Sequence, residues 1–250
     1  MRTVHALIAG TAVAALLAAT DLRAQNPSPA PPQGVAKSQA SSYDPALLQS
    51  ATLTEHAPAT FAVKVTTTRG SFIVTVTRAW APLGADRFYN LVKHHFYNGA
   101  SFFRVIQGFV AQFGISPYPA VTTAWEKSFI ADDPVKHSNT RGSVVFATSG
   151  PNTRTTQLFI NLVDNARLDP RGFAPFGHVT QGMAVVDSLY HGYGEGGMPG
   201  GGPDQEQMEK QGKPYIDKGW PKLDTIIRAS LYTPPAAPAS TKTTAPAPKP

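Results

Sequence analysis

The chain has 250 residues, a hydrophobic content of 42%, a formal net charge of +6 and no cysteine. This composition supports a folded core and excludes disulfides, zinc–thiolate sites, thiol catalysis and lipid attachment to an N-terminal cysteine. Because the basic residues are scattered among acidic ones rather than gathered in runs, we interpret the charge as a solvated surface and expect no nucleic-acid partner.

The first residues have the order of a secretory signal. Arg2 supplies a positive charge, the stretch from Ala6 to Ala19 is apolar, and the small residue Ala24 follows at a cleavage position. The apolar stretch is shorter than the roughly 20 residues of a membrane span. We therefore predict a cleaved signal peptide at 1–24 and an exported protein, periplasmic or secreted, with no stable membrane insertion after cleavage. An uncleaved anchor is the alternative.

Two segments rich in proline and alanine flank the middle of the chain. The first, residues 25–58, contains the run PSPAPP, and the second, residues 233–250, ends in APAPKP. Sequences of this kind bury too little apolar surface to offset the entropy lost on ordering. We predict a disordered spacer at 25–58, a disordered tail at 233–250 and one folded domain at 59–232.

The domain opens with strand patterns. Apolar and polar residues alternate from Phe61 to Val65, a turn follows at Arg69-Gly70, and residues 71–77 are rich in β-branched side chains. This pattern predicts a hairpin. Pro82 then begins a helical pattern, with Asp86 near its N-terminal end. Four residues share one face of that helix: Phe88, Leu91, Val92 and His95.

Short apolar runs separated by turn residues fill most of the remaining domain. They lie at 102–106, 109–113, 142–147, 158–162 and 176–179. Residues 183–189 have a second, shorter helical pattern, and residues 223–231 alternate loosely as a closing strand. Many short strands with two helices predict a mainly β barrel or sandwich with helical caps.

The common catalytic signatures are missing from the sequence. It contains no His-x-x-x-His pair and no Gly-x-Ser-x-Gly elbow, so we predict no metal site and disfavour a serine hydrolase. Residues 192–197 match the letters of a dinucleotide-binding fingerprint, but a helical pattern precedes them and a run of glycine and proline follows. Such a fingerprint needs a strand before it and a helix after it. We interpret the segment as a flexible loop and predict no cofactor.

Three sequence blocks occur in order at a recognisable spacing. The first is SFFRVIQGFVAQFG at 101–114, and the second is FATSGPNTRTTQLFI at 146–160. The third is Leu168-Asp169 followed by FGHV at 176–179. They resemble the FHRVIxGFxxQGG, GPNTxxSQFFI and LDxxxxxFGxV blocks of the cyclophilin family. Over about 60–232, the chain is similar to cyclophilin-type peptidyl-prolyl cis-trans isomerases.

The resemblance implies a closed antiparallel barrel of eight strands capped by two helices. It also implies isomerisation of X-Pro bonds in unfolded or partly folded polypeptides, which would be the partners of a monomeric protein. Arg104 and Gln112 take the catalytic positions. The substrate-binding positions are Phe109, Val110, Ala147, Thr148, Gln157, Phe159, Leu168 and Phe173.

The chemistry of the reaction suits these residue types. Rotation about an X-Pro bond faces a barrier of roughly 18–20 kcal/mol because the nitrogen lone pair is conjugated with the carbonyl. A permanently charged guanidinium at Arg104, aimed at the prolyl nitrogen as it becomes pyramidal, favours the twisted amide over both planar forms. An apolar pocket would hold the proline ring. No covalent bond changes, so the reaction requires no nucleophile, metal or cofactor.

The chain departs from the family pattern in several places. Arg167 stands where the family commonly has a Trp associated with cyclosporin binding, so we expect weak cyclosporin sensitivity. Phe103, Val110 and Phe173 replace the usual His, Met and His. Residues 191–221 form a glycine-rich insertion to which the sequence assigns no role. Two alternatives stay open: a catalytically weak peptide-binding module or chaperone with the same fold, and an unrelated secreted β-barrel that binds a small ligand.

Overall fold

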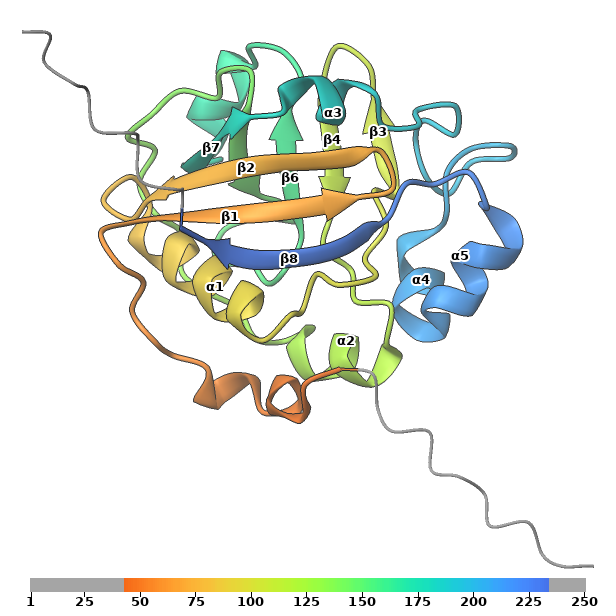
Figure 1. Cartoon of the computed structure of the whole chain (residues 1–250), viewed down its shortest axis with the longest axis horizontal. Helices are drawn as coiled ribbons and strands as arrows, with labels where there is room; N and C mark the ends of the chain where they lie inside the picture. Colours follow the sequence, from red (N-terminus) through yellow and green to blue (C-terminus); the bar gives the residue numbers. More distant parts are fainter. Residues whose placement is uncertain (1–42, 234–250) are drawn as a thin grey trace, which may run out of the picture. The chain divides into compact units, whose positions relative to one another are not determined.

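The computed structural model describes residues 43–233 (Figure 1). The predicted signal peptide, the predicted spacer up to residue 42 and the predicted tail from residue 234 lie outside the described residues. The strands are β1 (Thr60–Thr67), β2 (Gly70–Thr77), β3 (Arg104–Ile106), β4 (Val110–Phe113), β5 (Ser143–Phe146), β6 (Leu158–Asn161), β7 (Pro175–Gln181) and β8 (Ile226–Tyr232). The α-helices are α1 (Pro82–Lys93), α2 (Pro119–Trp125), α3 (Met183–Asp187), α4 (Gln205–Gln211) and α5 (Lys213–Gly219).

The eight strands form one antiparallel sheet in the order β3-β4-β6-β5-β7-β2-β1-β8. The predicted hairpin is confirmed, since β1 pairs with β2 from Thr60 opposite Thr77 to Thr67 opposite Gly70. The sheet curves, so that β8, β1 and β2 cross the front of Figure 1 while β6, β4 and β3 lie behind them. Its concave side is filled by the main apolar core, to which β1 contributes Val63 and Val65. A barrel built around an internal ligand does not fit this packed interior.

The sheet is open, so the prediction of a closed barrel is wrong. β3 and β8 are its two outer strands, and an isolated bridge between Ser101 and Thr225 links the segments that precede them. The next residue, Phe102, donates its backbone N–H to the Asp224 carbonyl at 2.9 Å. Phe103 then packs into a separate apolar cluster. Because the chain turns toward that cluster before β3 begins, β3 does not continue the pairing with β8.

Helix α1 agrees with its predicted apolar face except at the last position. Phe88, Leu91 and Val92 are all buried against the concave side of the sheet. His95 lies past the end of the helix, is exposed and has a φ of 60°. The helix therefore ends before the fourth residue of the predicted stripe can join the buried face.

The N-terminal end of α1 is satisfied by a carboxylate from outside the helix. The Leu83 and Gly84 N–H groups donate to Asp133 at 3.1 and 2.9 Å. Asp86, which the sequence placed near this positive end, binds Arg78 instead, at 2.7 Å from its Nε. A distant acidic side chain thus supplies the capping that no local residue of α1 provides.

Residues 43–58 form an N-terminal strap over the domain, whereas the sequence predicted that the disordered spacer reaches residue 58. The strap contains two short 3₁₀ helices, Pro45–Leu48 and Ser50–Thr52. Leu47 is buried in the main core, and its carbonyl accepts a 2.8 Å hydrogen bond from the Trp125 indole. The prediction rested on average composition, and a single apolar anchor such as Leu47 barely changes that average.

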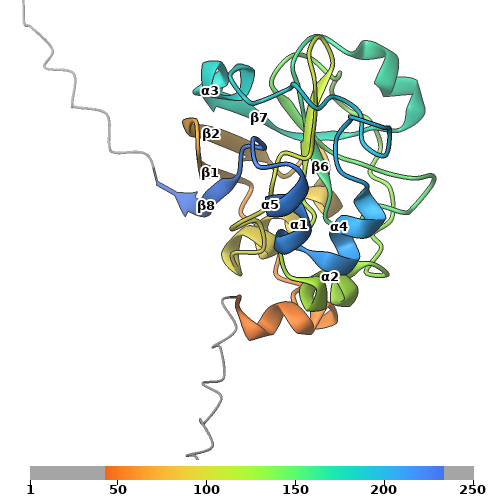
Figure 2. The ribbon, with the colours of Figure 1, turned by 90° about the vertical axis from the view of Figure 1, so that its right-hand side faces the viewer.

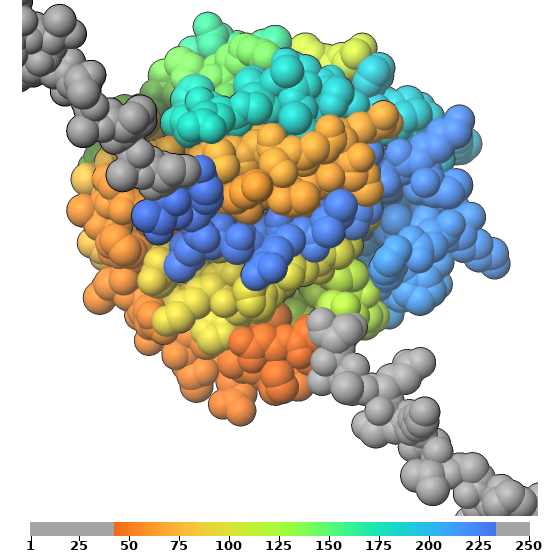
Figure 3. All heavy atoms as spheres, viewed as in Figure 1, coloured from red at the N-terminus to blue at the C-terminus, as the bar shows by residue number. Residues whose placement is uncertain are grey.

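The insertion at 191–221 is largely folded. The two predicted helices are present as α1 and α3, but the insertion adds α4 and α5, and with α2 these bring the described α-helices to five, so the predicted number of helices was too low. A second apolar cluster lies beneath them, formed by Phe103, Ile115, Met208, Ile216 and Leu223. Figures 2 and 3 show the insertion lying directly against the rest of the domain.

None of the helices within 43–233 is long and apolar enough to span a bilayer.

Candidate active site

Strand register aligns three of the predicted site residues. Arg104 on β3 pairs with Gln112 on β4, and Gln112 pairs with Phe159 on β6. Paired residues on neighbouring antiparallel strands project to the same face, so the three side chains form a row across the sheet. The Arg104 guanidinium donates from Nη1 to the Gln112 Oε1 at 3.3 Å. The first two sequence blocks are thereby joined in one site.

An apolar cluster lies beside this row. Val110, Val145, Phe159 and Leu168 are its buried members, and Phe109, Ala147 and Phe173 are partly exposed around them. Except for Val145, all of these were predicted to bind substrate. The Phe159 and Phe173 rings meet edge to face with centroids 5.6 Å apart. Buried side chains therefore form the floor of the cluster, and partly exposed ones form its border.

The Phe109 ring lies close to two arginines. The guanidinium carbon of Arg104 is 5.6 Å from the ring centroid, and that of Arg167 is 4.8 Å away. Both distances fall within the range of a cation–π interaction. The sequence identified Arg167 only as a replacement for a family Trp. In the structure, this replacement puts a second positive charge at the border of the apolar cluster.

A polar hollow of about 210 Å³ adjoins the row at Gln112. Gln112 donates from Nε2 to the Gln157 Oε1 at 2.9 Å, which ties β4 to the start of β6. Ala147 and Thr148 also line the hollow, and all four were predicted site residues. Gln205, from the first turn of α4, lines it as well and was not predicted.

Asp169 lies in a short 3₁₀ helix, Ala166–Arg171, and Asn152 lies in a turn. Burial by itself raises the pKa of Asp169, but hydrogen bonds from Asn139 and Ser138 hold that pKa below its usual value. Asn152 has a positive φ of 57°, and its side chain accepts from the Asp132 N–H at 2.8 Å. Both side chains therefore fix loop shape.

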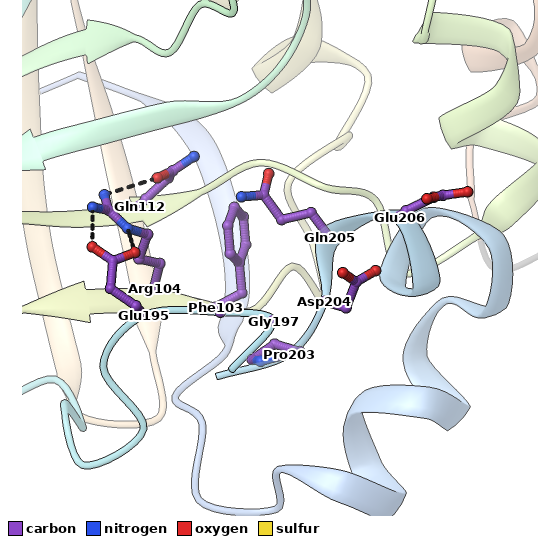
Figure 4. Close-up of a pocket in the computed structure, with 10 residues that line it drawn as sticks. Phe103, Arg104, Gln112, Glu195, Gly197, Pro203, Asp204, Gln205 and Glu206 are labelled. Atoms are coloured by element: carbon purple, nitrogen blue, oxygen red, sulfur yellow. Dashed lines mark hydrogen bonds and ion pairs between the residues drawn. The ribbon is translucent and has the colours of Figure 1, made fainter. Parts of the chain in front are cut away.

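Arg104 has a carboxylate partner that the sequence did not reveal. Glu195, in the loop before α4, accepts from Nε at 2.6 Å and from Nη2 at 2.5 Å (Figure 4). The hydrogen bond from Arg104 lowers the pKa of Glu195 below its usual value, so the carboxylate is ionised at neutral pH. The two residues are 91 positions apart, and no local pattern signals their contact.

Within the described residues, no three His, Asp or Glu side chains form a metal-binding group.

Comparison with known proteins places the chain in a family. Residues 62–210 match the family described as cyclophilin type peptidyl-prolyl cis-trans isomerase/CLD. A peptidyl-prolyl cis-trans isomerase of Acinetobacter baylyi is 37% identical in an alignment of 148 residues that covers 55% of this chain and 76% of that relative. The chain therefore belongs to the cyclophilin-type peptidyl-prolyl cis-trans isomerases, a family of isomerase enzymes.

Solved structures show the same fold. A cyclophilin type peptidyl-prolyl cis-trans isomerase of Cryptosporidium parvum matches with a TM-score of 0.52 at 18% identity, covering 70% of this chain and 99% of that one. The same protein, solved in the presence of the dipeptide Ala-Pro, matches with a TM-score of 0.51. At this identity, the likeness concerns the fold alone.

Proposed function

We propose that this isomerase twists X-Pro amides in unfolded or partly folded polypeptides, with Arg104 as the catalytic group and the apolar cluster as the seat of the proline ring. The observation that carries the proposal is the position of the Arg104 guanidinium, which lies 5.6 Å from the Phe109 ring at the border of that cluster. A charged donor beside an apolar recess is the pair of features that a twisted prolyl amide requires.

The magnitudes are compatible with this mechanism. Uncatalysed prolyl isomerisation takes on the order of tens of seconds, so turnover in milliseconds requires lowering the barrier by about 5–6 kcal/mol. One hydrogen bond from a charged group contributes about 1.5–3 kcal/mol. Arg104 would therefore supply up to half of the effect. The rest would come from two sources. Phe159 and Leu168 would pack against the proline ring, and Gln112 and Gln157 would form hydrogen bonds to the substrate backbone.

We further propose that the enzyme is exported and acts on polypeptides outside the cytoplasm. The support is the order of charge, apolar stretch and small residue at 1–24, which lies outside the described residues. Fusing residues 1–30 to a reporter that is active only after export tests this directly. A reporter that stays in the cytoplasm would contradict the proposal.

The mechanism is tested by comparing wild type with Arg104→Ala in an isomerase assay on a peptide containing one Ala-Pro bond. We expect kcat/KM to fall about 10- to 150-fold, which corresponds to the loss of about 1.5–3 kcal/mol. Arg228→Ala is the matched control, because Arg228 is an exposed strand arginine on β8. Its activity should equal that of wild type.

The same assay distinguishes the alternative of a peptide-binding module. The contact between Arg104 and Glu195 is the observation that raises this alternative, because it uses two of the guanidinium N–H groups. A loss of less than tenfold in Arg104→Ala, or a wild-type rate no faster than the spontaneous one, would favour the binding module and contradict the catalytic proposal.

A further inference from the structure

The ion pair between Arg104 and Glu195 has a specific geometry. The two carboxylate oxygens of Glu195 accept from Nε and Nη2, so the carboxylate binds one edge of the planar guanidinium with two hydrogen bonds (Figure 4). A two-bond contact of this kind fixes orientation as well as distance. The Arg104 side chain is only 19% exposed, whereas that of Glu195 is 53% exposed. The more exposed Glu195 thus binds the more buried Arg104 from the solvent side.

The insertion holds Glu195 in place through its backbone. The Gly202 N–H donates to the Glu195 carbonyl at 2.7 Å, and the Gly197 N–H donates to the Gly202 carbonyl at 3.2 Å. The Trp220 indole, at the end of α5, donates to the Gly201 carbonyl at 2.8 Å. These bonds fix the loop from both ends, so Glu195 is presented by a folded structure.

The insertion also packs against the start of β3, the strand that carries Arg104. Phe103 is 1% exposed and packs against Met208, Ile216 and Leu223 of the second cluster. A Cβ at Gly202 would lie 3.1 Å from the Phe103 carbonyl oxygen, so only a glycine fits without a shift of neighbouring atoms. Two consecutive residues of the chain, 103 and 104, therefore both contact the insertion.

We propose that Glu195 is a positioning residue for isomerisation and that the insertion at 191–221 exists in part to deliver it. By binding the Nε–Nη2 edge, Glu195 holds the guanidinium plane so that its other edge faces the substrate amide. This inference rests on the proposed function of Arg104. It accounts for the second cluster and for the glycine-rich loop, to which the sequence assigns no role.

The number of N–H groups on the guanidinium favours positioning over blockage. A guanidinium has five N–H groups in a rigid plane. The contacts described for Arg104 within residues 43–233 use two for Glu195 and one, at 3.3 Å, for Gln112. Donors on the Nη1–Nη2 edge thus stay available to a carbonyl or a prolyl nitrogen. A hollow of about 320 Å³, bordered by Arg104, Gln112 and Glu195, gives a peptide room beside them.

The test measures kcat and KM of Glu195→Ala and Glu195→Gln on the Ala-Pro peptide used for Arg104. Loss of orientation should lower kcat of the Ala variant about tenfold and leave KM nearly unchanged. The Gln variant keeps one accepting oxygen and should lose about threefold, because a neutral hydrogen bond is about half as strong as a charged one. The Arg104 Nε–H signal in ¹⁵N NMR should exchange slowly with water in wild type and rapidly in Glu195→Ala.

Asp217→Asn is the matched control, because it removes one carboxylate from the same insertion where Asp217 pairs with Lys213. It should leave both the kinetics and the Nε–H signal unchanged. An increase in kcat for Glu195→Ala would show that Glu195 blocks the site, and unchanged kcat would show that it is a passive contact; either result overturns the proposal. A wild-type protein without activity would overturn the proposed function as well, so the two failures are distinguishable.

Discussion

Two arginine–carboxylate pairs in this domain differ in burial and therefore in what they do. Arg154 and Asp133 have side chains only 4% and 2% exposed, with Nη1 3.1 Å from Oδ2. Arg104 and Glu195 are closer, at 2.5 Å, but 19% and 53% exposed. A buried pair has to satisfy its charges internally, whereas a half-exposed pair can keep donors for a ligand. Burial thus separates a structural arginine from the one that we propose to be catalytic.

The surroundings of each pair support this distinction. Asp133 also accepts from the first N–H groups of α1, so the buried pair links the start of that helix to the segment that precedes β6. The backbone of Glu195 is hydrogen-bonded within its loop, and the residue borders the site cavity. The buried pair should therefore respond to substitution through stability, and the exposed pair through rate.

The largest effect on stability is expected from Arg154→Met. The substitution leaves Asp133 charged and buried without its partner, which should lower the free energy of unfolding by about 3–5 kcal/mol. Chemical denaturation measures this change, and kcat of the remaining folded protein should equal that of wild type. Lys210→Met, which breaks an exposed pair with Glu206, is the control and should leave the stability nearly unchanged, because water screens an exposed pair. Equal effects of the two substitutions would contradict the comparison.

A smaller effect is expected from Trp220→Phe. The change removes the 2.8 Å hydrogen bond to the Gly201 carbonyl but keeps an aromatic ring against Tyr215. We expect a loss of about 1 kcal/mol in stability and a two- to threefold drop in kcat, because the loop that holds Glu195 loosens. Trp80→Phe, outside the insertion, should leave kcat unchanged. If Trp220→Phe also left kcat at its wild-type value while lowering stability, the link between loop and rate would be lost.

The smallest effect concerns pH. Burial lowers the pKa of His178 below its usual value of 6.5, and its Nδ1 has no hydrogen-bond partner among residues 43–233. The unfolded chain therefore takes up a proton first as pH falls below 6.5, and stability should decrease until the lower, folded pKa is passed. His178→Gln should flatten this dependence in denaturation experiments between pH 7 and 5. Because the pKa of Glu195 lies below 4.5, kcat of the folded protein should not change through loss of its charge in this window. An equally steep stability profile in His178→Gln would contradict the assignment.

Local patterns were sufficient to predict most strands, whereas the grouping of the site residues was implied only by the family resemblance. The β1–β2 hairpin follows from alternation within a few residues, and the row of Arg104, Gln112 and Phe159 follows from two sequence blocks that happen to pair in register. Each of these depends on neighbours close in sequence or on a motif that already encodes the pairing. The number of strands and their antiparallel pairing came only with the family resemblance, and the order of the strands was not predicted.

What could not be predicted depends on contacts between distant segments. Glu195 reaches Arg104 only because the insertion folds on Phe103, and composition marked that insertion merely as rich in glycine. The open edge between β3 and β8 has the same origin. Asp133 caps α1 from 49 positions away from Gly84, where no local rule would look for it. These features depend on packing between segments that are distant in sequence, whereas the helices and strands themselves follow from local propensity.

The N-terminal strap has a practical consequence for anyone who shortens this protein. The family match begins at residue 62, yet Leu47 is 1% exposed and its carbonyl holds the indole of Trp125. The cooperative folding unit is therefore longer than the family boundary suggests. A recombinant form starting at residue 59 would lack Leu47, would expose apolar core side chains such as Trp125 and would favour aggregation, whereas one starting at residue 40 would keep them covered.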